Sequence, residues 1–239
     1  MTATLSVEAA SRTHVGHVRR RNEDAFYQGQ WLYAVADGLG GHIAGDIAST
    51  TAIDTLKAYD QPVAAADLTD VLGKAINDAD EALRRKIREE PELAGMGTTM
   101  VAVLRSGNAA ALANIGDSRA YLMSNFRGHH SPMVQISEDH TYRYLVAEAN
   151  EVPNLPEKLA RFLDGRKDGR SPDLAVLQLH PGERILLCSD GLSSYVPEEL
   201  IRTTLNSPDS PSQIAEDLVE SALGHGGRDN VTVVVIDIM

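Results

Sequence analysis

Four short acidic segments of the sequence share one arrangement and suggest a metal site. They are Asn22-Glu23-Asp24, Asp37-Gly38, Asp190-Gly191 and Asp229-Asn230. Asp37 and Asp190 each follow an apolar run and precede a glycine, and Asp229 precedes the apolar run 231–236. A carboxylate at the edge of a strand has a fixed backbone, and an adjacent glycine lets a backbone carbonyl approach a ligand closely. If these carboxylates converge, they repel one another unless cations lie between them. Ligand sets made only of oxygen favour hard ions such as Mg²⁺ or Mn²⁺.

Other chemistries fit the sequence less well. An Asp-Gly pair is also a common turn, so each acidic segment taken alone is compatible with a turn. The glycines of 38–42 do not complete a dinucleotide-binding motif because position 43 is Ile, and no Gly-Lys-Ser/Thr triplet is present. Cys188 lies in an apolar run, and position 194 is Ser where a cysteine phosphatase loop needs Arg. We therefore predict that Cys188 is structural.

Composition excludes several classes of protein. The chain has 239 residues and a formal charge of −12, which argues against general nucleic-acid binding. Its single cysteine excludes an internal disulfide and a cysteine zinc cluster. No apolar run approaches the ~18 residues of a membrane span. The first residues, MTATLSVEAASR, lack the features of a secretory signal. These observations predict a cytoplasmic enzyme with no membrane contact.

The hydrophobic pattern predicts the elements that must position the carboxylates. Apolar runs predict strands at 31–37, 98–105, 109–115, 118–123, 174–179, 184–189 and 231–237. Apolar residues with helical spacing predict helices at about 43–58, 68–90 and 211–223. Asp67 is a candidate N-cap of the second helix. Short links between strands, such as Ser106-Gly107-Asn108, favour antiparallel sheets covered by helices. The stretch 124–173 has little periodicity and predicts a mobile surface subdomain.

Seven segments, taken in order, resemble the metal-dependent protein phosphatases of the type-2C (PPM) family, in particular its compact bacterial members. The segments are 16–24 (GHVRRRNED), 35–49 (VADGLGGHIAGDIAS), 97–104 (GTTMVAVL), 114–122 (NIGDSRAYL), 138–141 (EDHT), 186–192 (LLCSDGL) and 226–236 (GGRDNVTVVVI). The resemblance covers nearly the whole chain. It implies an α+β fold of two packed, mainly antiparallel sheets flanked by helices, a four-layer α-β-β-α sandwich. It also implies one catalytic domain over 1–239, with a short flap subdomain around 138–173.

The resemblance assigns metal ligands residue by residue. Asp37 matches the carboxylate that bridges two core ions, and Gly38 matches a backbone-carbonyl ligand. Asp190 and Asp229 match the remaining direct carboxylate ligands. Glu23 matches an acidic residue that holds metal-bound water. The implied cofactor is Mg²⁺ or Mn²⁺, with two core ions.

Further positions complete or depart from the pattern. Arg19 matches the phosphate-binding arginine, which makes Asp37 and Arg19 the expected catalytic residues, while the neighbouring Arg20 and Arg21 are expected to point elsewhere. Asp117, with Asp190, matches the ligands of a third, weaker metal in bacterial members, and Asp139 is a further candidate. Some members carry a histidine proposed as general acid where this chain has Leu39. No side-chain acid is therefore assigned.

The implied reaction is hydrolysis of phosphoserine and phosphothreonine in proteins by a hydroxide activated at the binuclear centre, reversing kinase signalling. The expected partners are phosphoprotein substrates and a cognate serine/threonine kinase, and a monomer is expected. Two alternatives stay open: a catalytically silent binding module of the same fold, and a hydrolase of small phosphate esters. The sequence identifies neither the substrate nor the kinase.

Overall fold

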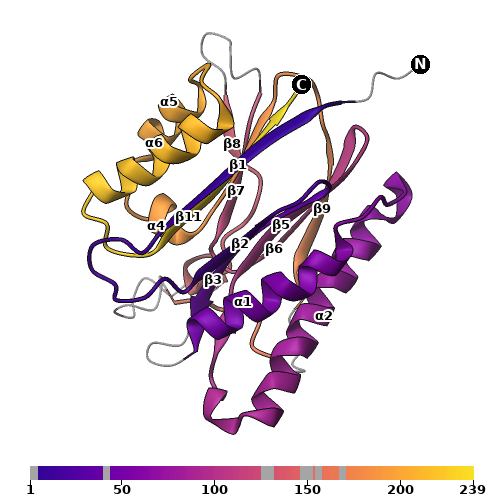
Figure 1. Ribbon diagram of the computed structural model, residues 1–239, viewed down its shortest axis with the longest axis vertical. Helices are drawn as coiled ribbons and strands as arrows, with labels where there is room; N and C mark the ends of the chain where they lie inside the picture. Colours follow the sequence, from indigo (N-terminus) through magenta and orange to yellow (C-terminus); the bar gives the residue numbers. More distant parts are fainter. Residues whose placement is uncertain (1–4, 40–43, 125–131, 146–152, 154–157, 167–170) are drawn as a thin grey trace.

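The described residues form two antiparallel sheets that pack face to face (Figure 1). The structure is a computed structural model that describes residues 5–39, 44–124, 132–145, 153, 158–166 and 171–239. The first sheet has the strand order β1 (Val7–His14), β11 (Val231–Ile238), β10 (Arg184–Cys188), β7 (Arg119–Met123) and β8 (Met133–Gln135). The second has the order β2 (Asp24–Gln28), β3 (Leu32–Leu39), β5 (Met100–Ser106), β6 (Ala109–Ile115) and β9 (Asp173–Gln178), with β4 (Gly97–Thr98) paired to β3.

Helices cover the outer face of each sheet. On the second sheet lie α1 (Gly45–Leu56) and α2 (Leu68–Glu89), and on the first lie α4 (Asp190–Ser193), α5 (Glu198–Leu205) and α6 (Pro211–Gly224). The shorter elements are α3 (Tyr142–Leu145), η1 (Lys57–Tyr59), η2 (Ala65–Asp67) and η3 (Pro91–Leu93). This four-layer α-β-β-α arrangement confirms the predicted α+β fold class. No helix in the described part of the chain is both long and apolar enough to cross a membrane.

Central strands are apolar on both faces because each of them separates two cores. Along β3, Leu32, Ala34 and Ala36 join the core under α1 and α2, while Tyr33 and Val35 join the core between the sheets. Successive side chains of a strand point to opposite faces, so one apolar run supplies both layers. The layered packing therefore fixes where each central strand begins and ends, and with it the residues at the strand ends.

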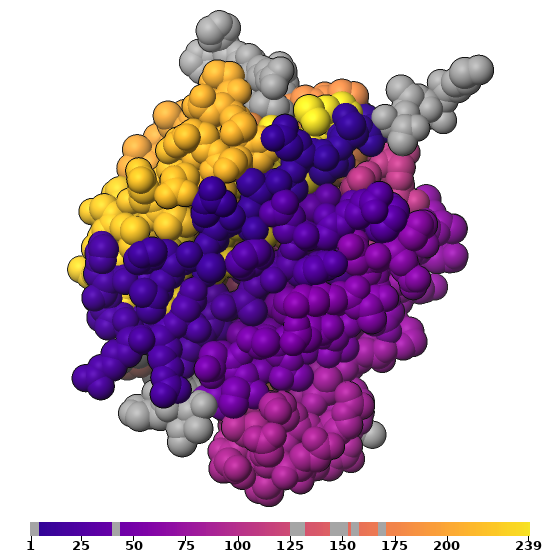
Figure 2. All heavy atoms as spheres, in the orientation of Figure 1, coloured from indigo at the N-terminus to yellow at the C-terminus, as the bar shows by residue number. Residues whose placement is uncertain are grey.

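The apolar runs predicted the central strands, and the strands β1, β2 and β8 were missed. The hairpin of β5 and β6, joined at Gly107, is confirmed. The missed strand β1 reads VEAASRTH and is largely polar, because it lies at the edge of its sheet and pairs only with β11. Figure 2 shows the N-terminal residues, in indigo, lying across both halves of the molecule. Asp67 precedes α2 as predicted, but its side chain makes no capping hydrogen bond.

The stretch 124–173 is not confined to the surface. Asp139, His140 and Leu163 within it are buried. Leu163 pairs with Thr98 through two backbone hydrogen bonds of 2.9 Å and joins the core under α1 and α2. The surface prediction was wrong for these residues, because isolated buried side chains between polar ones leave no periodic pattern. The flap subdomain at 138–173 stays a prediction.

A buried ion pair joins the ends of β10 and β11. Arg184 Nε donates to Asp237 Oδ1 at 2.6 Å and Arg184 Nη2 donates to Asp237 Oδ2 at 2.8 Å. The same guanidinium donates to the carbonyls of Leu205, Ser207 and Asp209, which ties the segment after α5 to the sheet. Arg184 is 0% exposed. A buried guanidinium keeps its charge, so its partners must remain in place.

We expect Asp237→Ala to lower the free energy of unfolding by about 3–5 kcal/mol, because it leaves the Arg184 charge buried without its counterion. The measurement is urea denaturation at neutral pH. Arg12→Ala is the control, since the pair of Arg12 with Glu216 is exposed and such pairs contribute at most about 1 kcal/mol. Similar losses for the two variants would contradict this interpretation.

Candidate metal centre

The acidic strand ends converge at one end of the sandwich. Asp24 begins β2 and pairs in register with Asp37 near the end of β3. Asp190 follows β10, Asp229 precedes β11, and Asp117 lies in the turn between β6 and β7. A cavity of about 250 Å³ lies among them, lined by Arg19, Glu23, Asp37, Gly38, Leu39, Asp117, Leu159, Asp190, Asp229 and Asn230. Apart from Asp139, all of the residues predicted for the site therefore line one cavity, while their roles as ligands stay predictions.

Two glycines allow the carboxylate-bearing segments to approach one another. A Cβ atom on Gly38 would lie 2.2 Å from the carbonyl oxygen of Gly45, at the start of α1. A Cβ atom on Gly191 would lie 1.8 Å from the carbonyl oxygen of Asn230. Any side chain at either position would push these backbones apart. The glycine after each of Asp37 and Asp190 therefore permits close packing of the loops that carry the acids.

Crowding raises the pKa of several carboxyl groups. Burial, followed by the nearby charges of Asp24, Asp190 and Asp117, raises the pKa of Asp37 well above its usual range. Burial also raises the pKa of Asp24 to about 7 and that of Asp117 to about 7. For Asp190, burial and the charge of Asp229 raise the pKa to about 6. Carboxyl groups with such raised pKa values lie where nearby positive charge does not balance their negative charge.

The oxygen atoms around the cavity are of the kinds that bind hard divalent ions. They are carboxylate oxygens and backbone carbonyls, the ligands that Mg²⁺ and Mn²⁺ prefer. Asp24 accepts a hydrogen bond of 2.8 Å from Ser189 Oγ, while its buried Oδ1 has no hydrogen-bond partner among the described residues. In that same part of the chain, no three His, Cys, Asp or Glu side chains are placed so that they could hold a metal ion together. Mg²⁺ usually keeps several of its waters and binds through only one or two protein carboxylates.

Asn230 holds the loop that carries Arg19 and Glu23. Its Nδ2 donates to the carbonyls of Val15 and Arg21, both at 2.9 Å, and its Oδ1 accepts from the backbone N–H of Glu23 at 2.8 Å. One amide therefore fixes both ends of the loop. The sequence named Asn230 only as the neighbour of Asp229 and gave it no role, because its partners lie more than 200 residues away along the chain.

Arg19 contacts the site as predicted, but it does so through one of the acids. Its Nη2 donates to Asp229 Oδ2 at 2.6 Å, and its side chain is 52% exposed. Burial opposes the charged form, yet the carboxylates of Asp229, Asp190 and Asp37 raise the pKa of Arg19. The guanidinium thus lies at the mouth of the cavity and offsets part of the negative charge.

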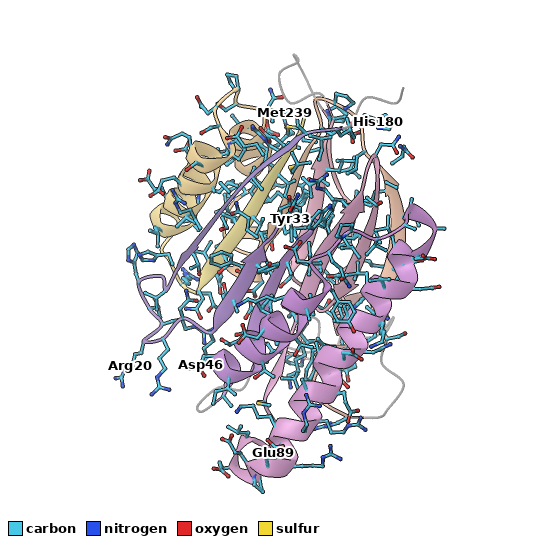
Figure 3. All side chains as sticks on the ribbon, turned by 45° about the vertical axis from the view of Figure 1, so that its right-hand side comes forward. Arg20, Tyr33, Asp46, Glu89, His180 and Met239 are labelled. Carbon is cyan, nitrogen blue, oxygen red and sulfur yellow. The ribbon has the colours of Figure 1, made fainter. Side chains whose placement is uncertain are left out.

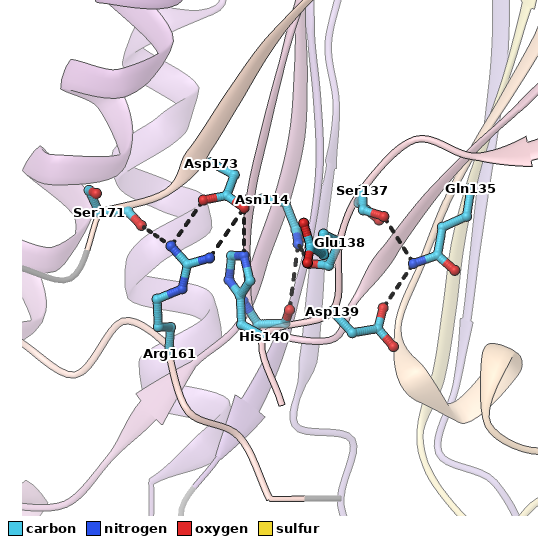
Figure 4. A network of polar contacts seen from close by, with 10 residues as sticks. Asn114, Gln135, Ser137, Glu138, Asp139, His140, Arg161, Ser171 and Asp173 are labelled. Carbon is cyan, nitrogen blue, oxygen red and sulfur yellow. Dashed lines mark hydrogen bonds and ion pairs between the residues drawn. The ribbon is translucent and has the colours of Figure 1, made fainter. Parts of the chain in front are cut away.

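A buried histidine holds the turn that carries Asp117, and Figure 4 shows the contact of this histidine, His140, with Asp173, which also contacts Arg161. His140 Nδ1 accepts a hydrogen bond of 3.1 Å from the backbone N–H of Gly116, so the proton of a neutral ring lies on Nε2. Nε2 then donates to Asp173 Oδ2 at 2.9 Å, and Asp173 also accepts two hydrogen bonds from Arg161. The network joins β9, the 158–166 segment and the Asp117 turn.

Asp139 has partners other than the cavity. Its carboxylate accepts hydrogen bonds from Arg119 at 2.6–3.1 Å and from Gln135 at 2.9 Å. It is buried and is not among the residues that line the cavity. The geometry therefore does not favour Asp139 as a ligand of a third ion.

Two residues at this end of the sandwich, Asp24 and Leu39, were assigned no role from the sequence. Asp24 was grouped with Glu23 but given no role, although strand pairing places it opposite Asp37. Leu39 does line the cavity, at the position where no acid was assigned. His42, a polar neighbour of the Asp37-Gly38 loop in the sequence, lies outside the described residues.

Cys188 does not take part in the site. It is fully buried in β10, and burial raises the pKa of its thiol to about 12. A thiol with that pKa is protonated at neutral pH and is a poor nucleophile. The structural interpretation of Cys188 agrees with this environment.

Comparisons with known proteins agree on one family. A model of the family described as protein phosphatase 2C matches residues 13–223. The serine/threonine protein phosphatase PstP of Mycobacterium tuberculosis is 40% identical over 99% of this chain, which spans about half of that relative, 46% of its length. The serine/threonine phosphatase stp of Listeria monocytogenes is 33% identical over 97% of this chain and 96% of the relative.

Solved structures show the same fold. The catalytic domain of PstP in complex with two manganese ions superposes with a TM-score of 0.88 at 39% identity, covering 99% of this chain and 100% of that one. The M. tuberculosis phosphatase PstP/Ppp gives a TM-score of 0.87 at 38% identity, covering 97% and 98% of the two chains.

We expect the metal-free protein to become more stable as the pH is lowered from about 7.5 towards 5. Asp24, Asp117 and Asp190 have pKa values of about 6 to 7 when folded, against 3.8 for the ordinary group. Between these values the folded state binds more protons than the unfolded state, so the free energy of unfolding falls as the pH rises. The measurement is thermal unfolding in EDTA across this range.

Asp37→Asn is the control for this pH dependence. Removing one interacting charge should flatten the dependence and raise the melting temperature in EDTA at neutral pH. Mn²⁺ should stabilise the wild-type protein and should have a smaller effect on the variant. An identical pH dependence for the two proteins would contradict the idea that mutual repulsion of these carboxylates limits stability.

Proposed function

The chain belongs to the protein phosphatase 2C family, and from that membership we propose that it hydrolyses phosphoserine and phosphothreonine in proteins with Mg²⁺ or Mn²⁺ as cofactor. The observation that carries this proposal is the convergence of carboxylates from separate strand ends on one cavity, with Arg19 at its mouth. Their raised pKa values indicate a site that gains from positive charge.

The proposed ligands follow from position and donor chemistry. Asp37 would bridge two ions, Asp190 and Asp229 would complete their carboxylate ligands, and the carbonyl of Gly38 would add a neutral oxygen. Glu23 would hold a water of the site, and Asp117, together with Asp190, would serve a third ion. Bound divalent ions would supply the attacking nucleophile by lowering the pKa of a water towards neutrality, and would offset charge on the phosphoryl oxygens.

The chain's own residues would bind and orient the substrate. Arg19 is at 2.6 Å from Asp229 in this structure, so it would exchange this carboxylate for two oxygens of the phosphoryl group, which match its planar fork. Asn230 would keep Arg19 and Glu23 in place while that exchange occurs. The apolar side chain of Leu39 cannot donate a proton to the leaving hydroxyl.

The proposal extends to the cellular setting. We infer that the enzyme works as a monomer in the bacterial cytoplasm, on proteins phosphorylated by a cognate serine/threonine kinase, and so takes part in signal transduction. The bacterial relatives named as serine/threonine phosphatases support this inference. It fits the acidic composition, which disfavours nucleic acid as a partner.

We expect the protein to hydrolyse a phosphothreonine peptide with Mn²⁺, and EDTA to abolish the activity. Asp37→Asn should lower kcat by at least about 100-fold, the scale on which enzymes lose rate with a group that stabilises transition-state charge. Arg19→Ala should lower kcat/KM by roughly 10- to 100-fold, because it removes charge-assisted hydrogen bonds to phosphate. Steady-state kinetics check both values, and circular dichroism checks folding.

The same assay separates the alternatives. A silent binding module would bind the phosphopeptide and show no turnover at saturating Mn²⁺. A hydrolase of small esters would prefer nucleotides or p-nitrophenyl phosphate to the peptide at equal concentration. Full activity of folded Asp37→Asn would contradict the proposed role of that residue.

A further inference from the structure

Three arginines that lie close in sequence to cavity-lining residues have side chains that make no hydrogen bond or ion pair with any residue that the structure describes. They are Arg20, Arg21 and Arg228, which we call the arginine rim. Arg20 and Arg21 lie between Arg19 and Glu23, both of which line the cavity, and Arg228 directly precedes Asp229. All three are exposed. In Figure 3 the labelled side chain of Arg20 projects away from the body of the molecule.

The rim is carried on a fixed backbone. The N–H of His17 donates to the carbonyl of Gly227 at 2.6 Å, which joins the two rim segments. Gly16 has a φ of 80°, and a Cβ atom there would lie 2.3 Å from the carbonyl oxygen of Asp229. Asn230 Nδ2 binds the carbonyl of Arg21 itself at 2.9 Å. The backbone segments that carry the rim therefore keep a defined position relative to the cavity.

Free arginines are unusual in this acidic chain. Most other described arginines contact acids, as in the pairs Arg12–Glu216, Arg119–Asp139, Arg161–Asp173, Arg166–Asp164, Arg184–Asp237 and Arg202–Glu199. With 34 acidic residues against 22 basic ones, an arginine that finds no acid inside the protein is available to an external anion. Arg85 on α2 is also exposed and without a recorded partner, but it lies outside the cavity lining.

The neighbouring basic segment offers less free charge. Within 158–166, Arg161 is held by Asp173 at 2.9 Å and Arg166 is paired with Asp164 at 3.3 Å. Arg161 is also part of the network that fixes the turn of Asp117. These two guanidinium groups serve the fold, so in this segment only Lys158, next to the cavity-lining Leu159, is exposed without a recorded side-chain partner, against three such arginines in the rim.

We propose that the arginine rim selects phosphoprotein substrates with acidic residues close to the phosphorylated residue. The proposal rests on the proposed phosphatase function. Three residues of an extended peptide span about 10 Å, which is close to one Debye length at ~0.1 M salt. Acidic residues within about three positions of the phosphorylated residue therefore come under the influence of the rim once Arg19 holds the phosphate.

The arginine rim also offsets the electrostatic repulsion between this acidic protein and an acidic substrate. A protein with a charge of −12 and a cavity lined by carboxylates repels an acidic phosphopeptide at long range. A local positive border offsets this repulsion where the peptide must dock. Charges at the border of an interface mainly affect association and its salt dependence, so the rim should act on KM for acidic peptides.

The test compares two phosphothreonine peptides that differ only in Glu or Gln at the flanking positions. Arg20→Glu, Arg21→Glu and the double variant are assayed with both peptides in Mn²⁺, and each rate is divided by that variant's rate with p-nitrophenyl phosphate. Arg85→Glu is the matched control for each single variant, because it makes the same change of charge at an exposed arginine away from the cavity. Arg228 is left intact, because it adjoins a proposed ligand.

We expect the double variant to lose roughly five- to tenfold in kcat/KM for the Glu peptide, through KM, and less than about twofold for the Gln peptide. The loss should shrink as salt increases, and Arg85→Glu should match the wild type. Equal losses for the two peptides, or no loss, would overturn the proposal while leaving the phosphatase function intact. A wild-type protein that hydrolyses neither peptide nor p-nitrophenyl phosphate would refute the proposed function, and this proposal with it.

A membrane surface is the competing anionic partner. Co-sedimentation with vesicles of phosphatidylcholine and phosphatidylserine tests it on the same variants. Wild-type binding that the double variant loses, together with unchanged selectivity between the peptides, would assign the rim to lipid headgroups and overturn the proposal. Absence of binding together with changed selectivity would support it.

Discussion

Mutual repulsion of carboxylates is the constraint around which this protein is built. Burial, and after it the charges of neighbouring carboxylates, raises the pKa of Asp24, Asp37, Asp117 and Asp190, and Asp229 adds a further charge. A chain would not gather these groups unless other interactions held the strand ends in place. The three apolar cores, one between the sheets and one under each helical layer, provide that force. The stability of the sandwich thus maintains a site that is unfavourable without cations.

Neutral polar side chains hold the charged ones in position. Asn230 fixes the loop of Arg19 and Glu23 through an amide that both donates and accepts. His140 fixes the turn of Asp117 through one ring nitrogen and reaches Asp173 through the other. Asn230 and His140 are uncharged side chains that hold these segments, so the carboxylates that line the cavity remain available to ligands. Replacing Asn230 or His140 would change the geometry of the cavity without removing any of its carboxylates.

The sequence predicted the site better than the contacts that support it. Asp37, Asp190 and Asp229 could be identified because each adjoins an apolar strand and a glycine or asparagine, which is a local pattern. The roles of Asp24 and Asn230 could not, because they depend on strand pairing and on partners far away in the chain. Strand β1 was missed since an edge strand with a polar face has no apolar run. The pairing of Arg19 with Asp229 spans 210 residues and is set by the fold alone.

The central claim is that the cavity among the strand ends holds two divalent ions bridged by Asp37. A crystal structure of the protein soaked in Mn²⁺, with anomalous differences recorded at the manganese edge, tests this claim most directly. The account predicts two strong peaks in the cavity, both within coordination distance of Asp37, with Asp190 and Asp229 among their other ligands. Peaks located elsewhere, or a cavity without manganese at saturating concentration, would contradict it.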